Sequence, residues 1–141
     1  NSIKKLCFVS SIATIEKGNK KTTDETEPWN NAAYKSGYAI TKFGAEMEVW
    51  RASQEGVEVV IVNPGVILGS GFWKKGSGKI FNLINNGFKF YTEGITGFVG
   101  VKDVVKIMRE LMRSNIKNER YVVVAENLSY KNIFFLIADS L

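Results

Sequence analysis

The stretch Val-Glu-Val-Val-Ile-Val-Asn-Pro-Gly, residues 57–65, is an almost unbroken β-branched run that ends at a turn. Valine and isoleucine favour strands, and a strand that is apolar on both faces is typical of a buried, parallel sheet. Asn63, Pro64 and Gly65 are turn residues. We therefore predict a strand over Val57 to Val62 that is covered on both faces.

The elements before this strand complete a βαβ unit. Lys4 to Ser10 contains a short apolar run, Leu6-Cys7-Phe8-Val9, of strand length. The helical spacing of apolar residues predicts a helix from about Ser36, as N-cap, to Gln54. Its apolar positions include Ile40, Phe43, Met47 and Trp50. Strand, helix and strand predict an α/β fold with a parallel sheet and a right-handed crossover.

The rest of the chain predicts further alternating elements. Polar residues from Glu16 to Asn31 indicate a surface loop, and Gly65 to Gly78 indicates a glycine-rich loop. We expect helices at about Lys79–Asn86, Lys102–Ser114 and Ser129–Leu141, and strands at about Gly94–Val101 and Arg120–Val124. Asn1 and Leu141 adjoin apolar elements directly, so we expect the chain to be a piece of a longer protein.

Composition narrows the class of protein. The chain has 141 residues, of which 45% are hydrophobic, enough for a core, and no run is long enough to span a membrane. One cysteine and no histidine give no metal site and suggest a reducing, cytoplasmic location. The net charge of +5 comes partly from basic groups in residues 17–21 and 74–79, within polar stretches. We interpret them as solvated loops and expect no nucleic-acid or membrane partner.

The candidate catalytic residues lie in the pentad Tyr38-Ala-Ile-Thr-Lys42. Residues four apart lie on one face of a helix, so Tyr38 and Lys42 can reach the same cleft. A phenol has an ordinary pKa near ~10, and a nearby ammonium favours its ionised form, which suits a proton donor or acceptor. A Ser10-Ser11 pair ends the first strand and offers a hydroxyl at the same sheet edge. The pentad alone has about an even chance of occurring by accident, so its neighbours carry the inference.

Together these pieces resemble the extended short-chain dehydrogenase/reductase superfamily of NAD-dependent epimerase/dehydratases, dihydroflavonol reductases and 3β-hydroxysteroid dehydrogenases. The matching segments cover most of the chain: Lys5–Ala13, Asp24–Pro28, Tyr38–Lys42, Val59–Gly69 and Phe98–Val105. The resemblance implies a partial Rossmann-type parallel sheet, its last βαβ portion, plus part of a small substrate-binding α/β region. We place the first at residues 1–66 and the second, with remaining Rossmann elements, at residues 67–141.

The resemblance also implies roles for individual residues. Tyr38 is the catalytic acid/base, Lys42 lowers the pKa of that phenol and binds the nicotinamide ribose, and Ser11 orients the substrate oxygen, with Ser10 as the alternative serine. The expected cofactor-binding residues are Ser10, Tyr38, Lys42, Asn63, Pro64, Gly65 and Val66. The cofactor is NAD or NADP, the substrate is a small ketone, alcohol or nucleotide sugar, and a homodimer is possible.

Two departures limit what the chain does by itself. The family's Gly-x-x-Gly-x-x-Gly turn is missing, and the first carboxylate of its Phe-Val-Asp-Val-Arg-Asp segment is Gly100 here. Gly76-Ser-Gly78-Lys79 does not follow the pattern of a Walker A loop, so we interpret it as part of a substrate loop. We expect this chain alone to be inactive.

Three functions stay open. Asn63 before Pro64 leans toward a dihydroflavonol-reductase or hydroxysteroid-dehydrogenase type of hydride transfer, because many sugar epimerases carry Arg at that place. A nucleotide-sugar epimerase/dehydratase is the alternative within the same class. A non-catalytic dinucleotide-sensing or scaffold protein is the alternative outside it.

Overall fold

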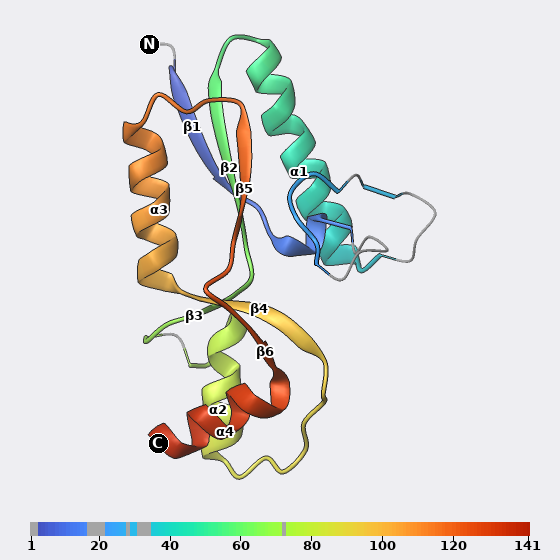
Figure 1. Cartoon of the computed structure of the whole chain (residues 1–141), viewed down its shortest axis with the longest axis vertical. Helices are drawn as coiled ribbons and strands as arrows, with labels where there is room; N and C mark the ends of the chain where they lie inside the picture. Colours follow the sequence, from blue (N-terminus) through green and yellow to red (C-terminus); the bar gives the residue numbers. More distant parts are fainter. Residues whose placement is uncertain (1–2, 17–21, 28, 31–34, 72) are drawn as a thin grey trace. The chain divides into compact units, whose positions relative to one another are not determined.

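The computed structural model describes residues 3–16, 22–27, 29–30, 35–71 and 73–141 (Figure 1). The chain divides into two compact units. Unit 1 comprises Asn1–Pro64 and Val105–Val123, and unit 2 comprises Gly65–Val104 and Val124–Leu141. The basic group within residues 17–21 and Pro28 of the acidic loop lie outside the described residues.

Unit 1 contains the predicted βαβ unit. Its sheet has the order β1-β2-β5, with β1 at Lys5–Val9, β2 at Glu58–Pro64 and β5 at Glu119–Val123. Both pairings are parallel, and Val9 lies opposite Val62. β2 is central and its Val59–Val62 run is fully buried, as its β-branched sequence predicted. The strand continues through Asn63 and Pro64, two residues further than expected, because both pair with β5.

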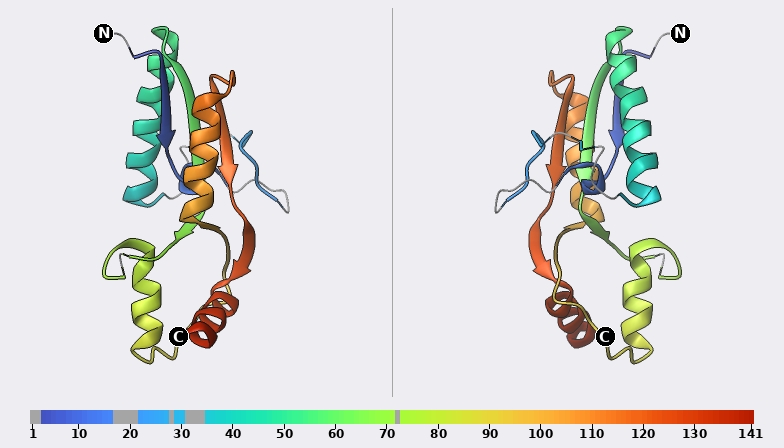
Figure 2. Two further views of the ribbon diagram at one scale, coloured as in Figure 1. Left: turned by 90° about the vertical axis from the view of Figure 1, so that its left-hand side faces the viewer. Right: turned by 90° about the vertical axis from the view of Figure 1, so that its right-hand side faces the viewer.

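Two helices lie on opposite faces of this sheet (Figure 2). α1, Gly37–Gln54, packs Val49 against Val59 and Ile61, with Leu6 and Phe8 of β1 at the edge of the same cluster. α3, Val101–Arg113, lies on the other face, where Lys5 of β1 reaches its C-terminal end. Lys5 Nζ donates to the main-chain oxygens of Leu111 at 2.8 Å, Ser114 at 2.7 Å and Ile116 at 2.7 Å. A cation is favourable there because the C-terminal end of a helix carries a partial negative charge.

The buried face of α1 includes a charged side chain. Two of the apolar positions that predicted the helix, Ile40 and Met47, are 55% and 38% exposed. The buried positions are Ala39, Glu46 and Val49. Glu46 can occupy this face because it meets hydrogen-bond donors from four other positions.

Unit 2 has a second sheet with the order β3-β4-β6. β4, Ile95–Gly100, pairs in parallel with β3, Val66–Leu68, and antiparallel with β6, Glu126–Ser129. The helices are α2, Lys79–Asn85, and α4, Tyr130–Ser140. Phe98, Ile133 and Ile137 form the core between β4 and α4.

β3 and β6 were missed by the sequence prediction. β3 has three residues inside the glycine-rich segment, and β6, Glu-Asn-Leu-Ser, has one apolar residue. Neither has the length or alternation that identifies a strand. Both form because β4 offers backbone partners on either side, which is a tertiary effect.

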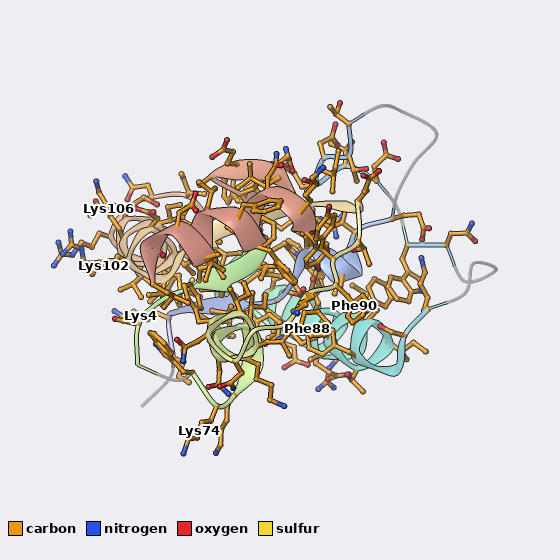
Figure 3. All side chains as sticks on the ribbon, turned by 90° about the horizontal axis from the view of Figure 1, so that it is seen from below. Lys4, Lys74, Phe88, Phe90, Lys102 and Lys106 are labelled. Atoms are coloured by element: carbon orange, nitrogen blue, oxygen red, sulfur yellow. The ribbon has the colours of Figure 1, made fainter. Side chains whose placement is uncertain are left out.

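Two aromatic side chains and several lysines are exposed to solvent (Figure 3). Phe88 and Phe90, after α2, contact edge to face with ring centroids 5.8 Å apart and remain 44% and 76% exposed. Lys74, Lys102 and Lys106 are exposed to solvent. Within the described ranges, no helix combines the length and apolar character that crossing a membrane requires.

Candidate active site

The candidate site lies at the carboxyl ends of β1 and β2. Ser10 directly follows β1, and its main-chain N–H donates to Val62 O of β2 at 2.8 Å. This bond extends the parallel ladder and places Ser10 and Ser11 beside Asn63. The predicted meeting of these residues at one sheet edge is therefore observed.

Tyr38 lies in the first turn of α1. Ser36 is the N-cap, with an extended backbone and a side chain that accepts from Ala39 N at 3.2 Å. The cap ends the preceding loop and begins the helix one residue before Tyr38. The tyrosine is 58% exposed, so its phenol is open to a ligand.

Lys42 lies one turn further along the same face and reaches the end of β1. Its Nζ donates to Val9 O at 2.7 Å and lies 4.6 Å from the ring centroid of Phe8. An ammonium has three N–H donors. Among the described residues one of them is accepted, so two remain for a ligand.

Ser11 begins a single turn of 3₁₀ helix, η1, at Ile12–Thr14. Its Oγ accepts from Ala13 N at 3.1 Å, and its main-chain oxygen accepts from Thr14 Oγ1 at 2.8 Å. Asn63 Nδ2 adds a third bond, to Ser11 O at 3.2 Å. Hydrogen bonds to the Ser11 main-chain oxygen hold the turn in place. The Ser11 hydroxyl proton has no acceptor in the described part of the chain.

Ser10 behaves differently from Ser11. It is 3% exposed, and its Oγ donates to Glu46 Oε2 at 2.6 Å. The same oxygen accepts from Asn63 Nδ2 at 3.1 Å and lies 3.1 Å from Thr14 Oγ1, whose single hydroxyl proton is shared with Ser11 O at 2.8 Å. Glu46 Oε1 accepts from Arg120 of β5, whose Nη1 is 3.2 Å away. We call Ser10, Thr14, Glu46, Asn63 and Arg120 the Glu46 network.

Glu46, Thr14 and Arg120 were missed by sequence reasoning. One signal was available: Tyr38, Lys42 and Glu46 are spaced by four residues and so share one helical face. A carboxylate on a helix face that also carries Ala39 and Val49 indicates either an unpaired buried charge or a buried polar cluster. No spacing rule relates Arg120, 74 residues away, to that helix.

A second ion pair lies on the loops before α1. Lys35 Nζ hydrogen-bonds Glu16 Oε2 and lies 4.7 Å from the ring centroid of Trp29. Trp29 in turn stacks on Phe43 of α1 at 4.2 Å, with 9° between the ring planes. The Lys35 hydrogen bond, with the charge of the same lysine, lowers the pKa of the Glu16 carboxyl below its ordinary value.

Lys35→Gln should return the pKa of Glu16 toward the ordinary glutamate value near ~4.3. A carboxyl whose pKa is lowered in the folded state contributes stability above its unfolded pKa and loses it as the pH falls through the folded pKa. Carbon-detected NMR titration of the Glu16 carboxyl in the full-length protein measures this directly. Lys117→Gln, which breaks the exposed pair with Glu58, is the control and should leave Glu16 unchanged. An unchanged Glu16 titration in Lys35→Gln would contradict the assignment.

Cys7 takes no part in this site. It lies in β1, where burial raises the pKa of its thiol and the positive charge of Lys5 opposes that rise in part. The thiol form is inert as a nucleophile.

The other predicted cofactor-binding positions lie along the chain where β2 leaves the sheet. Asn63 is fully buried, with its amide in the Glu46 network, and Pro64 is buried as the last residue of β2. Gly65 and Val66 belong to unit 2, where Val66 begins β3 and packs beside Phe98. Their roles toward a cofactor stay predictions.

The parallel sheet with its flanking helices defines a Rossmann-like α/β protein. A solved structure with this fold is UDP-glucose 4-epimerase from Thermus thermophilus in complex with NAD, with a TM-score of 0.78 at 21% identity. The match covers 97% of this chain and 48% of that one. The chain belongs to the NAD-binding family described as Male sterility protein, whose model matches residues 1–108.

Two curated relatives agree with this family. Sterol demethylase protein B of Methylococcus capsulatus is 25% identical over 135 residues, covering 93% of this chain and 40% of its own. Cinnamoyl-CoA reductase 2 of Medicago truncatula is 26% identical over 131 residues, covering 85% and 39%. The chain thus spans about 40% of the length of the curated relatives it matches.

The residues at the strand ends fit the nicotinamide end of a dinucleotide. A ribose presents hydroxyls, which accept from an ammonium and exchange hydrogen bonds with a phenol. Lys42 has N–H groups left for this, and the exposed Tyr38 lies one turn away on the same face. The donor set suits a neutral polyol, and the sequence carries no phosphate-binding Gly-x-x-Gly-x-x-Gly turn.

Proposed function

We propose that the full-length protein is an NAD(P)-dependent oxidoreductase that transfers hydride at a carbinol or ketone carbon, with Tyr38 as the acid/base. One observation carries the proposal. α1 presents Tyr38 and Lys42 on one face, and Lys42 is bonded to the last residue of β1, directly before Ser10 and Ser11. This arrangement supports a site in which the phenol of Tyr38, the ammonium of Lys42 and a serine hydroxyl act on one substrate.

Each group has a separate task. The nicotinamide supplies or accepts the hydride. Tyr38 donates the proton to the carbonyl oxygen during reduction and removes it during oxidation. Lys42 stabilises the phenolate by its charge and holds the ribose, and Ser11 donates a hydrogen bond to the substrate oxygen as its charge develops.

Ser11 suits the catalytic role better than Ser10. The Ser11 hydroxyl can donate outward, whereas the Ser10 hydroxyl donates to a buried carboxylate at 2.6 Å. Using Ser10 would require breaking that charge-assisted bond.

The reaction type leans toward net reduction, of the dihydroflavonol-reductase or hydroxysteroid-dehydrogenase kind. Asn63 before Pro64 supports this lean, since many sugar epimerases carry Arg at that place. Nucleotide-sugar epimerisation is the second candidate, supported by the fold shared with a UDP-glucose 4-epimerase. A cytoplasmic location and a homodimer complete the proposal.

A substrate panel on the full-length protein tests the function. Ketones, aldehydes and UDP-sugars are offered with NAD(H) and NADP(H), while nicotinamide absorbance and products are followed. We expect a net change in the nicotinamide together with a carbinol or ketone product. Conversion of a UDP-sugar without net change would select epimerisation. Cofactor binding without any hydride exchange across the panel would contradict catalysis and support a dinucleotide-sensing or scaffold role.

A further inference from the structure

The Glu46 carboxylate is the most deeply buried charged group among the described residues of unit 1. It is 0% exposed and accepts from Ser10, Thr14, Asn63 and Arg120. Burying a carboxylate costs free energy that hydrogen bonds and an opposite charge must offset. A fold that needed only packing here could place an apolar side chain, so the arrangement calls for another explanation.

The donors come from four different elements of the site. Ser10 follows β1, Thr14 ends η1, Asn63 lies near the end of β2, and Arg120 lies in β5. All four converge on one residue of α1. The hydrogen bonds of Glu46 therefore hold α1 against the carboxyl edge of the sheet, near Ser11.

The same face of α1 carries the reacting groups. Lys42 lies one turn before Glu46 and is itself bonded to Val9 O at 2.7 Å, and Tyr38 lies one turn before that. Two successive turns of α1 are therefore hydrogen-bonded to two successive residues of the sheet edge, Val9 and Ser10. These hydrogen bonds set the rotation of α1 about its axis and its position relative to the end of β1.

The network also orients the Ser11 turn. Thr14 Oγ1 donates to Ser11 O at 2.8 Å and is 3.1 Å from Glu46 Oε2, while Asn63 Nδ2 reaches both Ser11 O and Glu46. Arg120 extends the network to the acidic loop, since its Nε donates to Glu25 O at 2.8 Å. The link between Glu46 and Ser11 therefore runs through these shared hydrogen-bond partners.

We propose that Glu46 is a positioning residue that sets the placement of the Ser11 hydroxyl relative to Tyr38. The inference rests on the proposed function. A displacement of about 1 Å in an active site can lower turnover as much as ~100-fold, so a remote carboxylate can have a large kinetic effect.

The test compares Glu46→Gln with Glu48→Gln in the full-length protein. Glu48 is on the same helix, but its side chain is 67% exposed and pairs with Arg51 at the surface. Glu46→Gln should lower kcat by about ten- to a hundredfold per folded molecule, with the KM for the cofactor within about twofold of wild type. Glu48→Gln should leave both parameters unchanged.

A double-mutant cycle with Ser11→Ala separates positioning from general stability. If Glu46 acts through Ser11, Glu46→Gln should have little further effect once the Ser11 hydroxyl is gone. An equal fold loss in both backgrounds, a wild-type kcat in Glu46→Gln, or a Ser11→Ala variant with wild-type kcat would each overturn the inference.

Thr14→Val provides a milder variant if Glu46→Gln does not fold, because it keeps the shape and removes the hydroxyl that links Glu46 to Ser11 O. The same criteria apply, with a several-fold loss of kcat expected that Ser11→Ala abolishes. Failure of the proposed function is separately visible, since Tyr38→Phe would then keep full turnover. Loss of turnover in Tyr38→Phe, with Glu46→Gln behaving like Glu48→Gln, would overturn the positioning role alone.

Discussion

Tyr38→Phe should lower the turnover of the full-length protein by about a hundred- to ten-thousandfold, the range that general acid/base catalysis supplies. The substitution removes one hydroxyl from a side chain that is 58% exposed, so the fold has no buried partner to lose. Lys42 keeps its bond to Val9 O, and cofactor affinity should change little. The measurements are kcat with the substrate that the panel identifies and cofactor Kd by calorimetry.

Tyr91→Phe is the matched control for that experiment. Tyr91 is also partly exposed, at 46%, but it lies in unit 2, where its ring faces Phe135 at 6.0 Å. Its cofactor Kd should equal that of wild type, and its kcat should fall far less than that of Tyr38→Phe. Turnover in Tyr38→Phe within a few-fold of wild type would remove the acid/base role from this residue.

Gly65→Ala should destabilise the protein by about 3 kcal/mol or more, the upper part of the range for overpacking. A Cβ on Gly65 would lie 2.3 Å from Gly97 O and 2.7 Å from Gly97 C. Both are backbone atoms of β4, the central strand of the unit 2 sheet, so neither can turn aside as a flexible side chain can. Urea unfolding of the full-length protein, compared at constant slope, gives the change in the free energy of unfolding.

Gly44→Ala is the opposite case and serves as the control. Gly44 lies inside α1, and a Cβ there would meet nothing within 4 Å. Replacing an exposed helical glycine with alanine should stabilise by about 0.5–1 kcal/mol. Equal effects of the two substitutions would show that the close approach of Gly65 to Gly97 does not exist in solution. A loss of stability in Gly65→Ala together with a gain in Gly44→Ala would show that packing requires glycine at position 65, independently of any cofactor.

The sequence predicted the regular elements of unit 1 well because their signals are local. A short apolar run identified β1, a β-branched run identified β2, and helical periodicity with the Ser36 cap identified α1. The apolar pattern did not predict which face of α1 is buried, because Ile40 and Met47 are more apolar than Glu46, the residue that is buried. Hydrophobicity alone does not reveal a carboxylate that will find four donors from distant segments.

Unit 2 was predicted less completely. α2, β4 and α4 follow from apolar patterns, and Ser129 caps α4 by accepting from Asn132 N at 3.1 Å. β3 and β6 have no pattern of their own and depend on β4 for pairing. Short edge strands of this kind are decided by the partner available and not by propensity.

For the site, the sequence by itself predicted which helix face and which strand ends carry the candidate residues. Spacing of four places Tyr38 and Lys42 on one face of α1, and the parallel βαβ order brings Ser10, Ser11 and Asn63 to the same strand ends. The tertiary structure alone decided what each serine does. Ser10 is turned into a buried network with Glu46, and Ser11 keeps a hydroxyl proton to donate. The physical reason is that Glu46 draws its donors from η1, β2 and β5, across up to 74 residues of sequence that no local pattern connects.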